Sequence, residues 1–171
     1  MKVYPEKLAS HLKNTDSPIY IVSGDEPLLV QEACDQIRSG LKDAGYTERE
    51  LFHAEANFDW QQVLFSASSM SLFAEQKLIE IRMSSIRPGD KGAALQAYVE
   101  NPAPGTIILL VMPRLEKKVS ATKWFKAIEQ AGALVQIWPI ELKDLPGWIN
   151  TRFGKAGLKA SSEAVAIMAE R

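Results

Sequence analysis

With 171 residues, the chain is long enough for one well-packed domain and a small second one. Hydrophobic residues make up 46% and charged residues 24%, as in an ordinary globular protein, and a formal net charge of −1 gives no global electrostatic case for nucleic-acid binding. The single cysteine, Cys34, excludes an intrachain disulfide, and neither a signal peptide nor a membrane-spanning apolar stretch is recognisable. We therefore expect a soluble, cytoplasmic protein without a membrane partner.

Strands and helices are predicted to alternate along the first third of the chain. Residues 19–22 are a short apolar, β-branched run that predicts a buried strand. A helix is expected to follow, with Asp25 as its N-cap and Gly45 at its end. A weaker strand is expected at residues 51–52, and a short amphipathic helix at residues 59–67.

The same alternation continues through the middle of the chain. Residues 77–82 predict a third strand, and residues 93–99 predict a helix that ends at a break rich in proline and glycine. Residues 106–111 form an unbroken apolar run and predict a fully buried strand. Ser120 is the expected N-cap of the next helix, and residues 134–138 predict a fifth strand. Five strands separated by helices predict an α/β fold with a parallel, helix-covered sheet.

After the fifth strand the pattern contains only helices. One is expected to open at Pro146 and the next at Ser161, which is its predicted N-cap. The last helix has no stop signal before Arg171, so we expect the natural protein to be longer. The predicted domains are therefore an α/β domain at residues 1–140 and the first helices of a truncated helical domain at residues 141–171.

The turn after the first strand occupies the place of a phosphate-binding loop but lacks its residues. Such a loop needs a glycine, four residues, and then Gly-Lys-Ser or Gly-Lys-Thr. Counting from Gly24, the last three positions hold Leu29, Val30 and Gln31. The loop thus lacks the second glycine, the lysine charge on the phosphates and the hydroxyl that ligates Mg²⁺, while two acids directly after Gly24 repel an anion. An ordinary strand-to-helix turn is the favoured interpretation.

The acidic half of an ATPase site is missing as well. Met112, Pro113 and Arg114 follow the strand at residues 106–111, where an acid would be needed to hold Mg²⁺. The loss is independent of the changes in the loop. We therefore expect no ATP hydrolysis by this chain.

Other catalytic chemistry finds no support in the residue pattern. Two histidines, His11 and His53, and one cysteine give no zinc-ligand spacing. Cys34 lies on the apolar stripe of its helix and is interpreted as a core residue. Glu80 and Asp90 are interpreted as solvated carboxylates. No catalytic residue, metal or cofactor is predicted.

Two groups of basic residues lie near the ends of predicted strands. They are Arg82, Arg87 and Lys91, and Arg114, Lys117, Lys118 and Lys123. Contact with phosphate is one interpretation. Solvated surface is favoured, because the net charge is close to zero and no aromatic residues interleave with the cations.

A short segment before the third strand places large apolar side chains between serines. It includes Met70, Ser71, Leu72 and Phe73. Residue pattern alone favours burial of these side chains in the core. The alternative is an exposed hydrophobic plug that fits the pocket of a partner protein.

The sequence resembles the delta subunits of the bacterial DNA polymerase III clamp loader. The resemblance covers essentially the whole chain and is carried by residues 3–6, residues 24–32, residues 70–74, Trp124 and Phe125. It implies an AAA+-like first domain, related to P-loop NTPases but without a working nucleotide site. It also implies a small helical second domain and, beyond this chain, a third domain that joins the loader.

The same resemblance implies a function in DNA replication. Members of the family bind the sliding clamp (the beta subunit) and open it or trap it open, and their clamp contact corresponds to Met70, Ser71, Leu72 and Phe73. The chain would then belong to the DNA polymerase holoenzyme, a nucleotidyltransferase, without being an enzyme by itself. Its partners would be the clamp and the other clamp-loader subunits, with DNA contacted at most indirectly. The alternative is a divergent nucleotide-binding ATPase domain.

Overall fold

The computed structural model describes residues 1–14, 17–69 and 76–170. The chain divides into two compact units, Met1–Ile137 and Trp138–Arg171. None of the described helices is long and apolar enough to cross a membrane.

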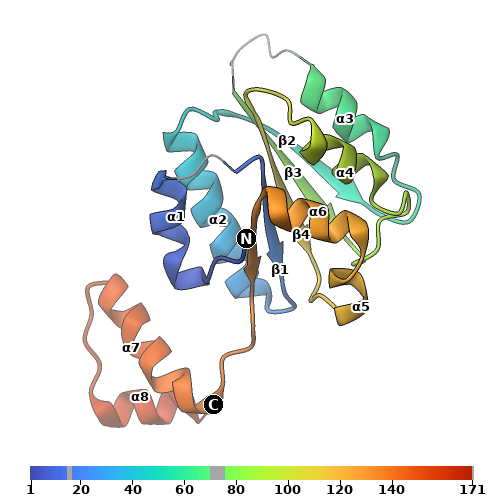
Figure 1. Cartoon of the computed structure of the whole chain (residues 1–171). Helices are drawn as coiled ribbons and strands as arrows, with labels where there is room; N and C mark the ends of the chain where they lie inside the picture. The colour runs from blue at the N-terminus through green and yellow to red at the C-terminus, as the bar shows by residue number, and fades with distance from the viewer. Residues whose placement is uncertain (15–16, 70–75, 171) are drawn as a thin grey trace. The chain divides into compact units, whose positions relative to one another are not determined.

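Within the described residues, five strands of the first unit form one parallel sheet, as the sequence predicts (Figure 1). They are β1 (Ile19–Ser23), β2 (Glu48–Ala54), β3 (Lys77–Met83), β4 (Thr106–Met112) and β5 (Ala133–Gln136), in the spatial order β2-β3-β4-β1-β5. The registers align Ile19 of β1 with Ile108 of β4, and Tyr20 of β1 with Ala133 of β5. Because all strands run the same way, the loops that follow them gather at one edge of the sheet, the carboxyl edge.

Burial of the strands follows their position in the sheet. Every residue of β1 and β4 is buried, since both strands have neighbours on either side and helices on both faces. The edge strand β2 alternates between exposed and less exposed residues. At the other edge, β5 ends at Gln136, and Trp138 is exposed. The predicted strand at residues 134–138 therefore extends too far.

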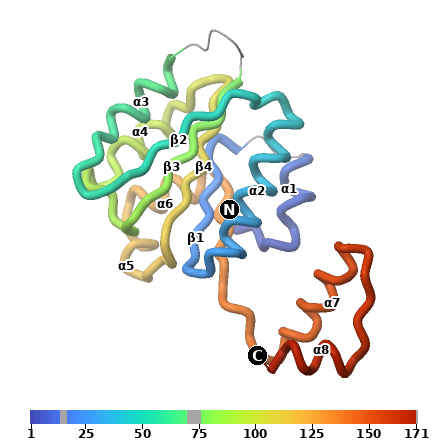
Figure 2. Tube along the Cα trace, turned by 180° about the vertical axis from the view of Figure 1, so that it is seen from behind, coloured from blue at the N-terminus to red at the C-terminus, as the bar shows by residue number. Residues whose placement is uncertain are grey.

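Helices cover both faces of the sheet. One face is covered by α3 (Gln61–Ser68), α4 (Ala93–Glu100) and α6 (Lys123–Ala131), and the other by α1 (Leu8–Asn14) and α2 (Pro27–Asp43) (Figures 1 and 2). Residues of β4 alternate between the two cores: Ile108 and Leu110 face α4 and α6, whereas Leu109 packs with Ile37 of α2 in the opposite core. The period of two in a strand thus divides one apolar run between two cores.

The N-terminal segment contains a helix that the sequence analysis does not predict. A short 3₁₀ turn, η1 (Pro5–Lys7), leads into α1, whose Leu8 is fully buried. The residues before it lie beside β5, because Val3 donates its N–H to the carbonyl of Leu134 at 2.8 Å. A seven-residue helix offers too few apolar positions for periodicity to reveal it.

Two of the predicted N-caps, Asp25 and Ser120, are wrong. The helix α2 begins one residue later than an Asp25 cap requires, and the carboxylate of Asp25 instead accepts the backbone N–H of Arg114 at 3.0 Å. Ser120 is the last residue of the unpredicted short helix α5 (Lys117–Ser120), and Thr122 is the N-cap of α6.

The second unit, as far as it is described, consists of helical segments. They are η2 (Leu142–Asp144), α7 (Leu145–Lys155) and α8 (Ser162–Ala169). Ile149 of α7 and Val165 of α8 are its buried apolar residues. The hydroxyl of Ser161 accepts the N–H of Ala164 at 3.1 Å, which confirms the predicted N-cap. The domain boundary expected after residue 140 stays a prediction.

Glu80 of β3 is a carboxylate buried inside the first unit. Its side chain is fully shielded from solvent and accepts hydrogen bonds from three arginines. The distances are 3.0 Å to Nη2 of Arg49 and 2.9 Å to Nε of Arg82, and Arg38 of α2 makes the third contact. The interpretation of Glu80 as a solvated carboxylate is therefore wrong. Asp90 accepts backbone N–H groups at the start of α4 and is only partly exposed.

The three guanidinium groups determine the ionisation of Glu80. Burial by itself would raise the pKa of this carboxyl. The hydrogen bond and charge of Arg38, together with hydrogen bonds from Arg49 and Arg82, hold the pKa below its ordinary value. The carboxylate is therefore ionised at neutral pH and joins α2, β2 and β3.

We expect Glu80→Gln to lower the free energy of unfolding by about 3 kcal/mol, because three arginines lose their shared counter-charge. Urea unfolding followed by circular dichroism measures the change. Asp35→Asn is the matched control, since Asp35 pairs with the same Arg38 but is largely exposed, and it should cost at most about 1 kcal/mol. Equal losses in the two variants would contradict a special role for the buried carboxylate.

The lowered pKa of Glu80 also predicts how stability depends on pH. A carboxyl whose pKa is lower in the folded than in the unfolded state stabilises the fold above the unfolded value, here 4.5, and loses this contribution as the pH falls through the folded value. The wild-type chain should therefore lose stability below about pH 4.5 more steeply than Glu80→Gln. Urea midpoints measured between pH 3 and pH 7 test this, and parallel curves for the two proteins would argue against it.

Candidate functional site

The turn after β1 is closely packed. Gly24 donates its N–H to the carbonyl of Met112 at 3.2 Å, and Ile137 donates its N–H to the carbonyl of Ser23 at 2.7 Å. A Cβ atom on Gly24 would lie 2.7 Å from Cβ of Ile137, which is too close for a side chain. Close approach of Ile137 thus accounts for the glycine.

The three positions counted from Gly24 belong to the first turns of α2. Leu29 and Val30 are half-buried and pack against the core beneath α2, and Gln31 is exposed. None of the three supplies a cation or a hydroxyl group. Asp25, through its bond to Arg114, adds a carboxylate between the ends of β1 and β4, where a phosphate would need positive charge.

Neither the neighbouring strand β4 nor β3, the next strand in the sheet, is directly followed by an acid. Met112 ends β4 and is followed by Pro113 and Arg114, and Met83 ends β3 and is followed by two serines. Among the described residues, no group of three or more histidine, cysteine, aspartate or glutamate side chains could hold a metal ion. The residues that directly follow β3 and β4 therefore do not supply the acid with which an ATPase holds Mg²⁺.

Cys34 is a core residue, as the sequence indicates. Its side chain is fully buried in the core beneath α2. Burial raises the pKa of the thiol to about 11, so it stays protonated at neutral pH and is a poor nucleophile.

The predicted clamp contact, Met70, Ser71, Leu72 and Phe73, lies outside the described residues. Its preceding flank is the end of α3. The hydroxyls of Ser68 and Ser69 both donate to the carbonyl of Phe65, at 3.0 and 2.7 Å.

The end of α3 is also tied to the start of β3. Lys77 is buried, and its ammonium group donates to the carbonyl of Ser66 at 2.9 Å and pairs with Glu50 at 3.1 Å. Glu50 in turn accepts the hydroxyl of Ser66. These bonds join α3, β2 and β3 beside both flanks of the predicted contact.

Phe65 of α3 is an exposed aromatic residue that the sequence analysis does not single out. Its side chain is 76% exposed, and it borders a cavity of about 450 Å³ that Phe52 and Lys77 also line. The sequence could have indicated this exposure, because Phe65 does not lie on the apolar face of α3 that Trp60, Val63 and Ala67 form.

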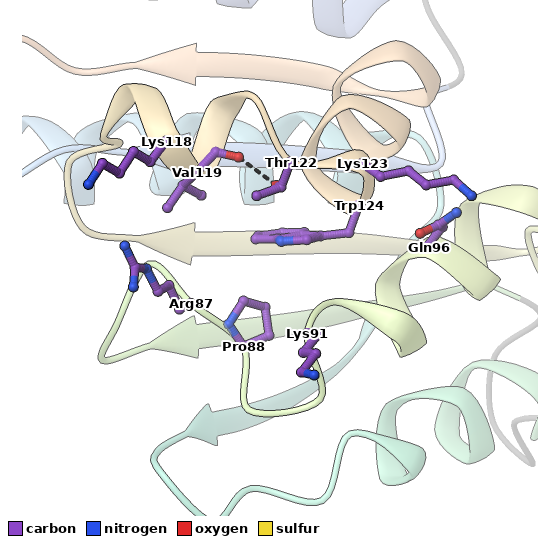
Figure 3. A pocket seen from close by; sticks show the side chains of 9 residues that line it. All are labelled: Arg87, Pro88, Lys91, Gln96, Lys118, Val119, Thr122, Lys123 and Trp124. Carbon is purple, nitrogen blue, oxygen red and sulfur yellow. Dashed lines mark hydrogen bonds between the residues drawn. The ribbon is translucent and has the colours of Figure 1, made fainter.

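The structure brings four of the seven basic residues singled out above to one cavity. Arg87 and Lys91 precede α4, and Lys118 and Lys123 lie on α5 and α6. All four are exposed and line a cavity of about 520 Å³ with Trp124 (Figure 3). Arg82 pairs instead with Glu80, and the backbone N–H of Arg114 binds Asp25. The exposure of these four side chains agrees with the predicted solvated surface. The sequence did not show that they line the same cavity.

Solved structures place the fold among AAA+-like proteins. The DNA clamp loader delta protein of Bacillus subtilis is similar, with a TM-score of 0.68 at 19% identity, over 94% of this chain and 50% of that one. A RuvB variant of Thermotoga maritima has a TM-score of 0.53 at 10% identity, over 97% of this chain and 54% of that one. These likenesses confirm the AAA+-like fold that the resemblance implies.

Curated sequences point the same way. The DNA polymerase III delta subunit of Haemophilus influenzae is 24% identical over 96% of this chain, and that of Escherichia coli is 25% identical over 96%. The chain covers 48% of each, so it spans about half the length of these relatives. The family model "DNA polymerase III, delta subunit" matches residues 20–137. The chain therefore belongs to the delta-subunit family of DNA polymerase III.

Proposed function

We propose that this chain is the clamp-binding and clamp-opening part of a clamp-loader delta subunit, acting in DNA replication in the cytoplasm. The family match over residues 20–137 carries this proposal, because the matched range includes the segment that corresponds to the family's clamp contact. Exposed Phe65 and the hydrogen bonds at the flanks support it, since they provide an apolar, well-anchored surface beside that segment.

Leu72 and Phe73 would enter an apolar pocket on the sliding clamp. Burial of each side chain would stabilise the complex by about 1.5–3 kcal/mol, which is enough to anchor binding. Opening the ring requires more than anchoring, because a ligand with equal affinity for two states shifts nothing. The proposed plug must therefore bind the open clamp more tightly than the closed one.

Tighter binding to the open clamp would require that the first unit holds the contact as a rigid body. The ammonium group of Lys77 links β3 to α3, and Glu80 links β3 to α2. Force at the end of α3 would therefore be transmitted to the sheet. This property supports an opening role, because a flexible support would yield before the clamp interface does.

We further propose that the chain does not hydrolyse ATP by itself and depends on ATP bound by other clamp-loader subunits. Packing of Ile137 on Gly24 and the carboxylate of Asp25 at the strand ends support this. Assembly with those subunits would depend mainly on a C-terminal region outside this chain. The chain itself covers about half the length of its relatives.

The double substitution Leu72→Ala and Phe73→Ala should weaken binding to the clamp of the same bacterium at least about 100-fold, because two apolar anchors are lost. Surface plasmon resonance measures binding, and calorimetry measures the melting temperature, which should not change. Leu28→Ala is the control, since Leu28 is an exposed leucine on α2. A large drop in melting temperature with clamp binding retained would show that the segment belongs to the core instead.

The chain should release no phosphate from Mg²⁺-ATP above the background of a heat-denatured sample, because the turn after β1 lacks the lysine and hydroxyl of an ATPase. A coupled phosphate-release assay over a series of chain concentrations measures this. Release that rises in proportion to native chain and requires Mg²⁺ would instead favour a divergent ATPase.

A further inference from the structure

Four cations line the cavity beside Trp124. In the part of the chain that the structure describes, none of Arg87, Lys91, Lys118 and Lys123 is in an ion pair, whereas the three arginines around Glu80 all are. Four unpaired cations around one cavity create a local positive potential that the net charge of the chain conceals. Such a potential attracts an anion with more than one charge.

None of the described residues that line this cavity carries a carboxylate. The acids nearest in sequence are Asp90 and Glu116, and neither is a lining residue. The carboxylate of Asp90 accepts the N–H groups of Gly92 and Ala94, at 2.8 and 2.9 Å, and so serves the start of α4. The cavity therefore offers cations and no acid that could hold Mg²⁺ beside a ligand.

The two basic segments are held together by close packing. Lys91 has a left-handed backbone with φ of 62°, and Gly92 follows with φ of 80°. A Cβ atom on Gly92 would lie 2.2 Å from Cγ of Trp124, so only glycine allows this approach. Figure 3 shows Arg87, Pro88 and Lys91 on one side of Trp124 and Lys118 on the other.

Trp124 forms a wall of the cavity. Trp124 is only 7% exposed, which leaves little surface on which a base could stack. Its packing keeps cations from two distant segments in one place without a ligand. A site preorganised in this way loses less entropy when it binds.

We propose that this cavity binds linked phosphate groups, either of a free polyphosphate or of a nucleic-acid backbone. Lysine and arginine are the ordinary side chains for phosphate, and four of them match several phosphates better than one. A volume of about 520 Å³ lies in the usual range for a ligand site. Few lining groups could read a base, so binding should not depend on sequence.

This site is separate from the other two features of the sheet. It follows the ends of β3 and β4 at the carboxyl edge, while the flanks of the proposed clamp contact lie at the amino end of β3. None of its lining residues belongs to the turn after Gly24. Phosphate binding here therefore does not depend on the proposed clamp binding or on a phosphate-binding loop.

Calorimetric titration of the 171-residue chain without Mg²⁺ tests the proposal. The probes are sodium tripolyphosphate and a short oligothymidylate, each in 50 mM and 200 mM salt. Oligothymidylate that contacts all four cations should bind about 50-fold more weakly at the higher salt concentration. Binding of tripolyphosphate alone would assign the site to a free polyphosphate, and binding of the oligonucleotide would assign it to a strand. Absence of binding by both probes at 50 mM salt would overturn the proposal.

Two pairs of substitutions, one inside the cavity and one outside it, test whether the probe binds in the cavity. Lys118→Gln with Lys123→Gln should weaken the bound probe at least about 10-fold and reduce its salt dependence. Lys7→Gln with Lys42→Gln removes the same charge from exposed residues outside the cavity and should change affinity less than about 3-fold. Melting temperatures verify that both variants fold. Equal losses in the two variants, or equally tight binding of a heptaglutamate peptide, would overturn a phosphate site.

Discussion

Complete burial of β1 and β4 is the constraint on which the rest of the first unit depends. Both strands are shielded along their whole length, so their backbone groups must find hydrogen-bond partners and their apolar side chains must meet apolar neighbours. Helices on both faces meet this need, with Phe125 of α6 in one core and Ile37 of α2 in the other. Parallel strands in turn direct all their following loops to one edge. The turn after β1 and the cavity beside Trp124 lie at that edge because of this topology.

Glu80 is a fully buried charge inside this largely apolar sheet. A lone carboxylate at this depth would be strongly destabilising, and three arginines offset that cost. Since Arg38 comes from α2 and Arg49 from β2, the cluster favours one placement of the edge strand and one of the helix. A buried ion cluster need not stabilise a fold more than apolar residues of the same volume would, but loss of one partner is costly. By joining α2, β2 and β3, it would also make the sheet beside the proposed clamp contact more rigid.

The two edges of the sheet suit different partners. At the carboxyl edge, Ile137 packs on the turn after β1, and the unpaired cations collect at the ends of β3 and β4. At the amino edge, the flanks of the proposed clamp contact present the exposed ring of Phe65 beside the anchored Lys77. A protein partner and an anionic ligand would therefore meet separate surfaces. The family match over residues 20–137 includes the residues of both surfaces.

Local pattern determined the five strands and the main helices, because apolar runs and stripes encode burial directly. It also predicted that Leu29, Val30 and Gln31 do not hold a phosphate, and this stays a prediction. Local pattern did not reveal the short α1, and it misjudged Glu80, whose partners Arg38 and Arg49 lie 42 and 31 residues away. Only the tertiary structure brought Lys91 and Lys118 to one cavity, since the pairing of β3 with β4 decides that contact. A residue's own sequence neighbours determine whether it is buried in a strand or a helix, but its charge partners depend on which strands become adjacent.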